Sequence, residues 1–484
     1  MGRHGIYITE EATDVSAAVN GASGIPVVIG IAPINMAADP DAVTNKPVLV
    51  HSAAEARKLL GYDDDLKTYT LCQMIYAMEK MHPVAPVVFI NVLDLTKNKK
   101  NFSEEVVDVV QNQATLKKKG VIRKGLTVKK GSAEFTNLTI DTDYTLSYDA
   151  DGYLVVTLTA AGAEKAAGSV KIGGDVVDAS TITKKEIIGA VDPVTGAESG
   201  IQLVRQVYPK FGVVPGFVLA PGFSHEAEVG AVLSASAELI NGVFKAMAIV
   251  DLDTTKTKVY TAVKEQKEAA GFTAPNEIVA WPMDKLGDAI LCKSVTAAVG
   301  MAYLDANNDN VPSLSPSNKA IKVTGQCLAD GTEVVLDQNQ ANTVNEAGVV
   351  TAINVNGWRL WGNYTAAYPA SRDAKDMFIA VRRMFNWQGN TFIQAYFDKV
   401  DDPMNAVLVE SVVDSENIRC AAYAPDKWAG ATIEYRKEDN PTTDVLAGKM
   451  TFRQRIAPYT PAQEIVNVLS YDTSLLMGAI GGAE

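Results

Sequence analysis

Short, unbroken runs of apolar residues recur along the chain and alternate with segments of helical character. Residues 25–31 (IPVVIGI) and 86–92 (PVVFINV) are two such runs, and the segments 53–60 and 69–81 lie between them. An apolar run without alternation is typical of a strand that is covered on both faces. Strands that alternate with helices predict a largely parallel sheet. The pattern therefore indicates an α/β core.

The same rhythm returns after residue 199. A chain that alternates in this way builds its sheet through parallel crossover connections. A helix of mostly small residues is expected over 289–304, ahead of a polar stretch at 305–318. The other expected strands are 213–219, 243–250 and 277–281, and the other expected helices are 201–208, 226–239 and 259–270.

Between about residues 96 and 189 the pattern changes to short alternating segments with many turn signals. Residues 144–148 and 153–158 flank the turn Asp149–Gly152, which predicts a β-hairpin. The segments 170–172 and 175–177 flank Gly173-Gly174 and suggest a second hairpin. We interpret this region as a small all-β, sandwich-like domain inserted into the α/β core.

The last part of the chain combines helical and alternating patterns. Apolar residues of helical spacing at 378–385 predict one helix. Asp402-Pro403 supplies a cap and a first-turn proline for a second helix that runs to about Glu416. Alternating segments follow at 431–435, 449–456 and 464–471, so an α+β domain is expected.

The N-terminal end has too little apolar surface to pack as a domain, the C-terminal end is apolar but too short to fold alone, and we interpret both as arms. The N-terminal end holds the alternating run Ile6-Tyr7-Ile8, and the C-terminal end holds Leu475, Leu476 and Ile480 among glycines. The fold class is thus α/β plus α+β, in several domains. The predicted order is an N-terminal arm (1–20), the first part of the α/β core (21–95), the inserted domain (96–195), the rest of the core (196–363), the α+β domain (364–471) and a C-terminal arm (472–484).

Composition agrees with several globular domains and excludes some classes of function. The chain has 484 residues, 47% of them apolar and 21% charged, whereas a single core stops growing near about 250–300 residues. A net charge of −13 argues against general nucleic-acid binding, because a polyanion is repelled. No apolar run reaches the roughly 18 residues of a membrane span and no secretory signal begins the chain, so we expect a cytosolic protein without membrane insertion. The four cysteines lack the spacing of a disulfide framework or a zinc site.

A search for catalytic motifs leaves one alternative open. The sequence Gly222-Phe223-Ser224-His225 approaches the nucleophile turn of α/β hydrolases, but Glu226 stands where the pattern requires glycine. The competing interpretation makes Ser224 the N-cap of the helix 226–239. A hydrolase that uses Ser224 or His225 therefore stays the alternative to a protein without catalysis.

Other motifs for cofactors are absent from the sequence or incomplete. There is neither a phosphate-binding GxxxxGK[ST] loop nor a metal-binding pair of histidines. Residues 305–309 resemble the start of a calcium loop, but Asn310 and Pro316 replace its glycine and its glutamate. We therefore predict no cofactor and no metal.

Residues 117–130 carry seven positive charges and no acidic residue. Lysines in a β-rich segment commonly protect an exposed sheet edge from incorrect pairing. We favour this interpretation over a binding site for an acidic surface.

Five stretches resemble the contractile tail sheath family of phages and phage-tail-like particles. In this sequence they are 208–224 (YPKFGVVPGFVLAPGFS), 315–319 (SPSNK), 362–365 (GNYT), 378–385 (FIAVRRMF) and 439–444 (DNPTTD). The first is similar to the strand that leads into the α/β, subtilisin-like domain of that family, the second matches its loop after the long helix, and the last three resemble its C-terminal domain. The resemblance implies a subunit that forms sixfold rings or a helical homo-oligomer around a tail tube, between a baseplate and a tail terminator. It also implies assembly in the bacterial host cytoplasm and release with the virion or particle.

The resemblance gives the two arms a role. Arms of this family add strands to neighbouring subunits, which implies that Ile6, Tyr7, Ile8, Leu475, Leu476 and Ile480 contact other copies. Without a nucleotide site, contraction would draw on a metastable extended lattice. Arg382 and Arg383 either face an acidic tube surface or are solvated on a helix. Another homopolymer, such as a tube or shell protein, is a further alternative, although the length and the two arms favour a sheath.

Overall fold

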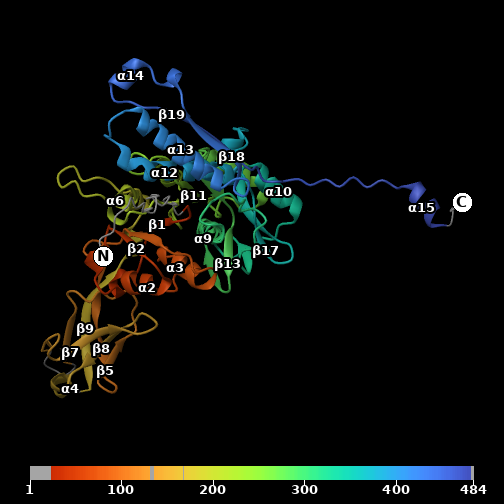
Figure 1. The fold of residues 1–484 in the computed structure, drawn as a ribbon. Coiled ribbons are helices and arrows are strands. Elements are labelled where there is room, and N and C mark those ends of the chain that lie inside the picture. The colour runs from red at the N-terminus through yellow and green to blue at the C-terminus, as the bar shows by residue number, and fades with distance from the viewer. Residues whose placement is uncertain (1–22, 131–135, 167, 481–484) are drawn as a thin grey trace, which may run out of the picture.

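The computed structural model describes residues 23–130, 136–166 and 168–480. Its centre is an eight-stranded sheet with the order β17-β16-β12-β11-β10-β1-β3-β2 (Figure 1). The six inner strands run parallel, and the edge strands β17 and β2 run antiparallel to their neighbours. The strands are β1 (Pro26–Gly30), β2 (Pro47–Val50), β3 (Val87–Asn91), β10 (Phe217–Leu219), β11 (Met247–Asp251), β12 (Glu277–Ala280), β16 (Val349–Asn354) and β17 (Trp358–Trp361).

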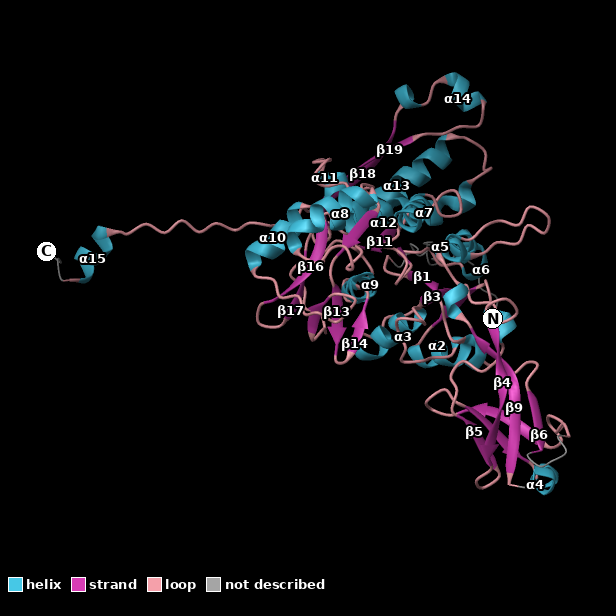
Figure 2. Ribbon diagram, turned by 180° about the vertical axis from the view of Figure 1, so that it is seen from behind, coloured by secondary structure: helices cyan, strands magenta, loops and turns pink. Residues whose placement is uncertain are grey.

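Helices connect these strands and cover the sheet (Figure 2). The residues of β1, β3, β10, β11 and β12 are all buried, as expected for unbroken apolar runs. The predicted α/β character is therefore confirmed. The helices are α1 (Pro40–Val43), α2 (Ala53–Leu60), α3 (Leu71–Lys80), α5 (Lys184–Ile188), α6 (Val207–Phe211), α7 (Ala227–Glu238), α8 (Val263–Ala270), α9 (Lys293–Ala306) and α10 (Gln338–Glu346), with short 3-10 turns at 34–36, 179–181, 200–206 and 260–262.

The helix that we predicted over 289–304 begins later than expected. Its first residues form the strand β14 (Ala289–Leu291), which pairs with β13 (Met283–Leu286) in a small sheet that also contains β15 (Gly325–Cys327). Gly287 has a φ of 64° in the turn between β13 and β14, a conformation that favours glycine. Small residues are compatible with both helix and strand, so the turn at Gly287 determines that residues 289–291 form a strand.

Residues 99–177 fold around a hydrophobic cluster of their own, which includes Leu116, Leu154 and Ile172. In Figure 1 they lie below the central sheet. The predicted hairpin is confirmed as β7 (Tyr144–Tyr148) and β8 (Leu154–Leu158). Two three-stranded sheets are present, β4-β9-β6 and β5-β8-β7. The remaining elements are β4 (Lys99–Asp108), β5 (Gln113–Leu116), β6 (Thr127–Lys130), β9 (Ser169–Val177) and α4 (Ala160–Ala166).

The second predicted hairpin is wrong, because residues 169–177 form the single strand β9 between β4 and β6. Gly173 and Gly174 make close packing possible and do not form a turn. A Cβ atom on Gly173 would lie 2.6 Å from Cγ of Glu104, and one on Gly174 would lie 3.0 Å from Cδ1 of Leu126. The register of β4 shifts between Phe102 and Glu105, opposite these glycines.

The C-terminal part consists of helices packed on a two-stranded sheet. Its core includes Met384, Trp387, Cys420 and Trp428. The helix predicted to follow Asp402-Pro403 begins instead after Asn405, whose side chain accepts a hydrogen bond from the amide of Leu408 at 2.9 Å. The elements are α11 (Ala374–Met377), α12 (Ile379–Tyr396), α13 (Ala406–Ala422), β18 (Trp428–Tyr435), α14 (Thr442–Leu446), β19 (Phe452–Pro458) and α15 (Thr473–Ala479), with 3-10 turns at 397–399 and 437–439.

Candidate assembly interface

The C-terminal segment leaves the body of the molecule after β19 and extends away from it (Figures 1 and 2). Residues 459–472 form neither helix nor strand, although we predicted a strand at 464–471. Nothing in the described ranges pairs with this alternating stretch, and α15 follows at its far end. Its apolar side chains are almost fully exposed, with Ile465 at 88%, Val468 at 85% and Leu469 at 86%.

The predicted contact residues in α15 are also exposed. Leu475 is 74% exposed, Leu476 is 43% exposed and Ile480 is 70% exposed. Isolated apolar residues on a surface are normal, but a continuous group of this kind marks a site of interaction. The unpaired backbone groups of 464–471 also indicate a site of interaction, because amides and carbonyls that leave water need hydrogen-bond partners.

Two tyrosines hold the base of this segment in an open position. Tyr459 donates a hydrogen bond from its hydroxyl to the carbonyl of Pro425 at 2.9 Å. Tyr364 donates to Oε1 of Gln463 at 2.8 Å. From Glu464 to Tyr471, no hydrogen bond joins the segment to any other described residue.

The sheet formed by β18 and β19 offers free edges on the same module. The two strands pair antiparallel from Trp428–Pro458 to Tyr435–Phe452. In the part of the chain that the structure describes, neither has a second strand as neighbour. A free edge presents unpaired amides and carbonyls that can bind another strand.

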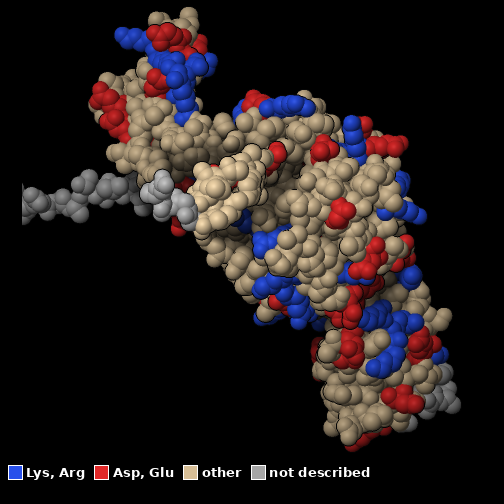
Figure 3. All heavy atoms as spheres, turned by 90° about the vertical axis from the view of Figure 1, so that its right-hand side faces the viewer, with Lys and Arg blue, Asp and Glu red and all other residues tan. Residues whose placement is uncertain are grey.

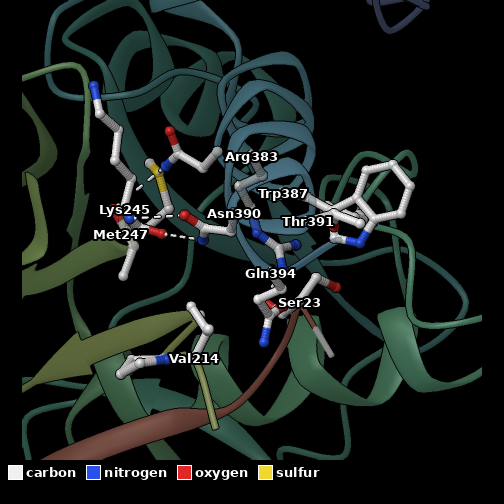
Figure 4. Close-up of a pocket in the computed structure, with 14 residues that line it drawn as sticks. Ser23, Val214, Lys245, Met247, Arg383, Trp387, Asn390, Thr391 and Gln394 are labelled. Atoms are coloured by element: carbon white, nitrogen blue, oxygen red, sulfur yellow. Dashed lines mark hydrogen bonds between the residues drawn. The ribbon is translucent and has the colours of Figure 1, made fainter. Parts of the chain in front are cut away.

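The predicted N-terminal contacts Ile6, Tyr7 and Ile8 lie outside the described residues. Ser23, the first described residue, lies on the wall of a cavity next to α12. Figure 4 shows side chains of α12 facing Ser23 and Val214 across this cavity. Asn390 of α12 joins the opposite wall, because its amide nitrogen donates to the carbonyl of Lys245 at 2.7 Å and its oxygen accepts from the Lys245 amide at 2.9 Å.

The structure contradicts both interpretations of Arg383, since this side chain is neither solvated nor free to face a tube. It is 3% exposed and forms a two-pronged ion pair with Asp305, which is 1% exposed. Ser23 donates from Oγ to the same carboxylate at 2.9 Å. Arg383 therefore joins α12, the end of α9 and the start of the described chain.

Arg382 is half-buried on the same helix. It donates to Asp376 at 3.2 Å and lies with its guanidinium carbon 5.5 Å from the centre of the Phe385 ring. Burial lowers the pKa of Arg382, and Asp376 opposes that effect. Both arginines are thus engaged within the chain.

Ser224 is neither the N-cap of α7 nor an accessible nucleophile. The N-cap position is Glu226, while Ser224 is fully buried. The Ser224 hydroxyl donates to Oδ2 of Asp251 and accepts from the Asp251 amide, both at 3.0 Å. Ser294 donates to the same carboxylate, whose pKa is raised by burial.

His225 does not complete a catalytic triad. A triad requires an imidazole between the hydroxyl and the carboxylate, but here Ser224 bonds to Asp251 directly. The imidazole of His225 instead lies with Nε2 3.8 Å from the carboxylate of the neighbouring Glu226. The arrangement fits a core network and not acyl transfer.

The usual ligand position of an open α/β sheet is filled by side chains. Such ligands bind at the carboxyl ends of the strands where the strand order reverses, here between β1 and β10. Thr70 Oγ1 accepts from the Ile31 amide at 3.2 Å, and Asn91 Oδ1 accepts from the Ala32 amide at 3.0 Å. A Cβ atom on Gly222 would lie 2.8 Å from Cγ2 of Thr70, so Thr70 packs closely against the backbone at this crevice.

The structure gives no support to a metal or redox site within the described ranges. No group of three or more His, Cys, Asp or Glu residues there can hold a metal ion. The four cysteines are buried and free, and burial raises the pKa of the Cys72 thiol to about 12. No helix among the described residues has the length and apolar character needed to cross a membrane.

The lysine-rich segment finds its acidic partners elsewhere in the chain. Lys118 pairs with Glu105, Lys119 with Asp63, and Lys129 with Glu104. The strand β6, which forms the end of this segment, is an edge strand. On the face drawn in Figure 3, positive and negative residues lie side by side over the lower part of the molecule, which agrees with the protective role of the lysines.

Comparison with known proteins gives sheath proteins in both sequence and structure, although no model of a protein family matches. The tail sheath protein of Burkholderia phage BcepMu is 24% identical over 99% of this chain and 98% of its own length. The tail sheath protein of Escherichia phage P2 is 25% identical over 58% of this chain and 69% of its own. A putative prophage major tail sheath protein of Pseudomonas aeruginosa is 26% identical over 61% and 74%.

Two solved structures share the fold over nearly their whole length. A chain of the baseplate of the anti-feeding prophage has a TM-score of 0.58 at 12% identity and is covered to 99%, with 98% of this chain matched. A chain of the sheath complex of an extracellular contractile injection system in the contracted state has the same TM-score and coverage at 14% identity. In sequence over nearly its whole length, and in fold, the chain is thus similar to contractile tail sheath proteins.

Proposed function

We propose that this protein is the structural subunit of a contractile tail sheath, whose copies polymerise around a tail tube by exchanging strands through their terminal arms. The observation that carries the proposal is the segment from Glu464 to Ile480, which is apolar, exposed and without a strand partner in the described chain. The sheath proteins among the relatives support the same role. A sheath subunit acts by assembly, so the role is structural and not enzymatic.

The C-terminal arm has the length and pattern of a donated strand. The alternating stretch 464–471 has eight residues, one more than the seven of β19. Each buried aliphatic side chain contributes roughly 1.5–3 kcal/mol, and each hydrogen bond of the ladder roughly 0.5–1.5 kcal/mol net. These gains oppose an ordering cost of about 1–2 kcal/mol per residue. Pairing is thus favourable only where most side chains of the arm are buried.

We assign the second donated strand to the N-terminal arm with Ile6, Tyr7 and Ile8. Ser23 fixes its base beside α12 through Asp305. Two arms link each copy to two neighbours, which is the connectivity of a sixfold ring or a helical lattice. The tail tube inside, and the baseplate and terminator at the two ends, complete the proposed set of partners.

Contraction would release free energy that is stored when the lattice assembles. The sequence contains no nucleotide-binding loop, so a metastable extended lattice is the source that agrees with the chain. Subunits would move as nearly rigid bodies while the arms act as hinges. The movement would drive the tube through a cell envelope, after assembly in the bacterial cytoplasm and release with the virion or particle.

We also infer that the central sheet is the subtilisin-like domain of the sheath family and that residues 96–195 are its insert. The separate hydrophobic cluster of 99–177 supports the second inference. The hydrolase alternative is not proposed, because Ser224 is buried and bonded to Asp251. A sheath domain can keep such a fold without its catalysis, since function depends on the site and not on the fold.

The test is assembly of arm variants observed by negative-stain electron microscopy. We expect deletion of 464–484, or Asp at both Ile6 and Ile8, to leave a folded subunit that forms no tubes. Val194→Asp is the matched control, because Val194 is 91% exposed in a loop outside both arms. Circular dichroism verifies that each variant is folded. Tubes of normal length from either arm variant would refute strand exchange.

A further inference from the structure

The helix α15 cannot be stable as an isolated element in water. It has seven residues, whereas isolated helices shorter than about 12–15 residues are marginal. The side chain of Asp472 caps it by accepting from the amides of Ser474 and Leu475. A cap contributes only about 1 kcal/mol, so α15 needs a packing partner.

Its side chains indicate that this partner surrounds much of the helix. At 100° per residue, Leu476, Met477 and Ile480 lie on one side of α15 and Leu475 lies about 100° from Leu476, so these exposed apolar residues span roughly 200° of the circumference. A helix that is apolar on most sides is typical of a buried position. The partner of α15 is therefore a groove and not a flat surface.

A groove of suitable character lies at one end of the β18–β19 hairpin. It is bounded by the start of α13, the end of β18 and the helix α14, which stands at the top of the molecule in Figure 1. Glu410 and Asn405 are its polar lining residues. Its other lining residues are Met404, Ala406, Val409, Tyr435, Val445 and Met450.

The direction of the strands in this sheet connects the groove with the donated strand. Phe452, where β19 begins, pairs with Tyr435 at the end of β18, and Tyr435 lines the groove. A strand added antiparallel to the free edge of β19 runs toward that end. The stretch 464–471 is one residue longer than β19, so Asp472 and α15 would emerge at the groove.

We propose that α15 of one copy docks into the groove between α13, α14 and the end of β18 on another copy. This inference rests on the proposed strand exchange and extends it, since it assigns the apolar end of the arm to a site of its own. The second copy is the occupant for two reasons. The arm that carries α15 is held open by Tyr364 and Tyr459, and the docking continues the interface that the strand begins.

Crosslinking between two different variants tests the contact and its intermolecular character. One chain carries Met477→Cys and the other carries Met450→Cys, and the mixture is assembled and treated with a short bis-maleimide. The four native cysteines are buried and do not compete. We expect a covalent pair of two chains. Val407→Cys replaces the groove variant as the control, because Val407 is 73% exposed on α13 and does not line the groove.

Two outcomes of this experiment would overturn the proposal. Tubes that form without a crosslink above the Val407→Cys background show that α15 docks elsewhere. A single chain with both Met477→Cys and Met450→Cys that crosslinks within itself before assembly shows that the groove takes its own tail.

Truncation separates this inference from the function on which it rests. Removal of 472–484 keeps the donated strand, and we expect the concentration needed for tube formation to rise roughly tenfold, equivalent to about 1.4 kcal/mol. Val445→Asp in the groove should produce a similar rise. If both variants assemble like the parent while removal of 464–484 abolishes tubes, docking of α15 is wrong and strand exchange stands. Normal assembly without 464–484 would remove both.

Discussion

Replacing Arg383 by alanine is expected to destabilise the junction between α12 and α9 strongly. The guanidinium holds a carboxylate that is almost completely buried, and it lies 4.6 Å from the centre of the Phe217 ring. Removing one member of a buried ion pair leaves an uncompensated charge and costs roughly 3–5 kcal/mol. The lost contact with Phe217 adds about 0.5–2 kcal/mol. An exposed pair would instead cost about 0–1 kcal/mol.

Hydrogen exchange of amides in α12 is the appropriate assay. A chain with several domains does not unfold in one step, so a global melting curve mixes unrelated events. Exchange that requires opening of this junction should accelerate by a factor of about 10² to 10⁴ in Arg383→Ala, as the same free energy implies. Arg382→Ala is the control, because Arg382 is half-buried and its partner Asp376 is not enclosed.

A double variant distinguishes the pair from the two residues taken singly. With Asp305→Asn and Arg383→Met together, no charge stays buried, and Ser23 can still donate to the asparagine oxygen. We expect the double variant to recover about 2–3 kcal/mol relative to the sum of the single variants. A loss below about 1 kcal/mol in Arg383→Ala, or strict additivity, would refute the buried pair. Unchanged exchange combined with lost binding to tail tubes would return Arg383 to a tube-facing role.

Further predictions concern three buried residues, Glu277 in β12, Lys267 in α8 and Ser224 after β10. Burial raises the pKa of Glu277 to about 7 from 4.5, so the folded state binds more protons than the unfolded chain between these values and stability falls as pH rises through them. Hydrogen-exchange protection factors of amides in β12 should therefore fall between pH 5 and 7 more in the parent than in Glu277→Gln, and equal slopes would contradict the assignment. Burial lowers the pKa of Lys267 to about 8 from 10.5, which adds stability as pH rises between these values. Ser224→Ala should lower the free energy of unfolding by about 1–3 kcal/mol, because the Asp251 amide loses its acceptor. The variant should still assemble into normal tubes, as observed by electron microscopy. Parental stability of this variant would show that the hydroxyl is not needed.

Five inner strands of the central sheet, β1, β3, β10, β11 and β12, were predictable because each is an apolar run, whereas β2, β16 and β17 were not predicted. Residues 26–30 and 87–91 are fully buried. Because both faces of these strands are buried, their sequences show no alternation of apolar and polar residues that would indicate a half-exposed strand. The helix α2 matched its predicted bounds because Ser52 caps it and Gly61 ends it with a φ of 75°. Local chemistry and tertiary packing agree at these positions.

The incorrect predictions concern residue types that can have either of two structural roles. Gly173 and Gly174 signal a turn by propensity, but they are required here by the close approach of Glu104 and Leu126 from neighbouring strands. Arg383 has the sequence pattern of an exposed helical arginine, and only the arrival of Asp305 from α9 makes it a buried ion pair. Both contacts join residues distant in the sequence, so no local pattern contains them.

At the candidate interface the sequence pattern of a strand could be recognised, but the partner of that strand could not be predicted. Residues 464–471 alternate like a strand and were predicted as one, yet pairing requires a second strand that the described chain does not supply. The groove between α13 and α14 was not predicted at all. Its lining combines Met404, Tyr435 and Met450, which are ordinary residues in sequence and meet only after three elements pack.

The same edge of β19 that would bind a neighbour's arm is also the edge closest to the chain's own arm. Pro458 ends β19 and the alternating stretch begins at Glu464, so a hairpin loop of ordinary length would close the subunit on itself. Three features oppose this closure. Pro461 biases Thr460 toward an extended backbone, Tyr459 bonds to the carbonyl of Pro425, and Tyr364 bonds to Gln463 in the arm. Since the ladder bonds are alike within one chain and between chains, these few contacts at the base of the arm decide between a closed monomer and a polymer.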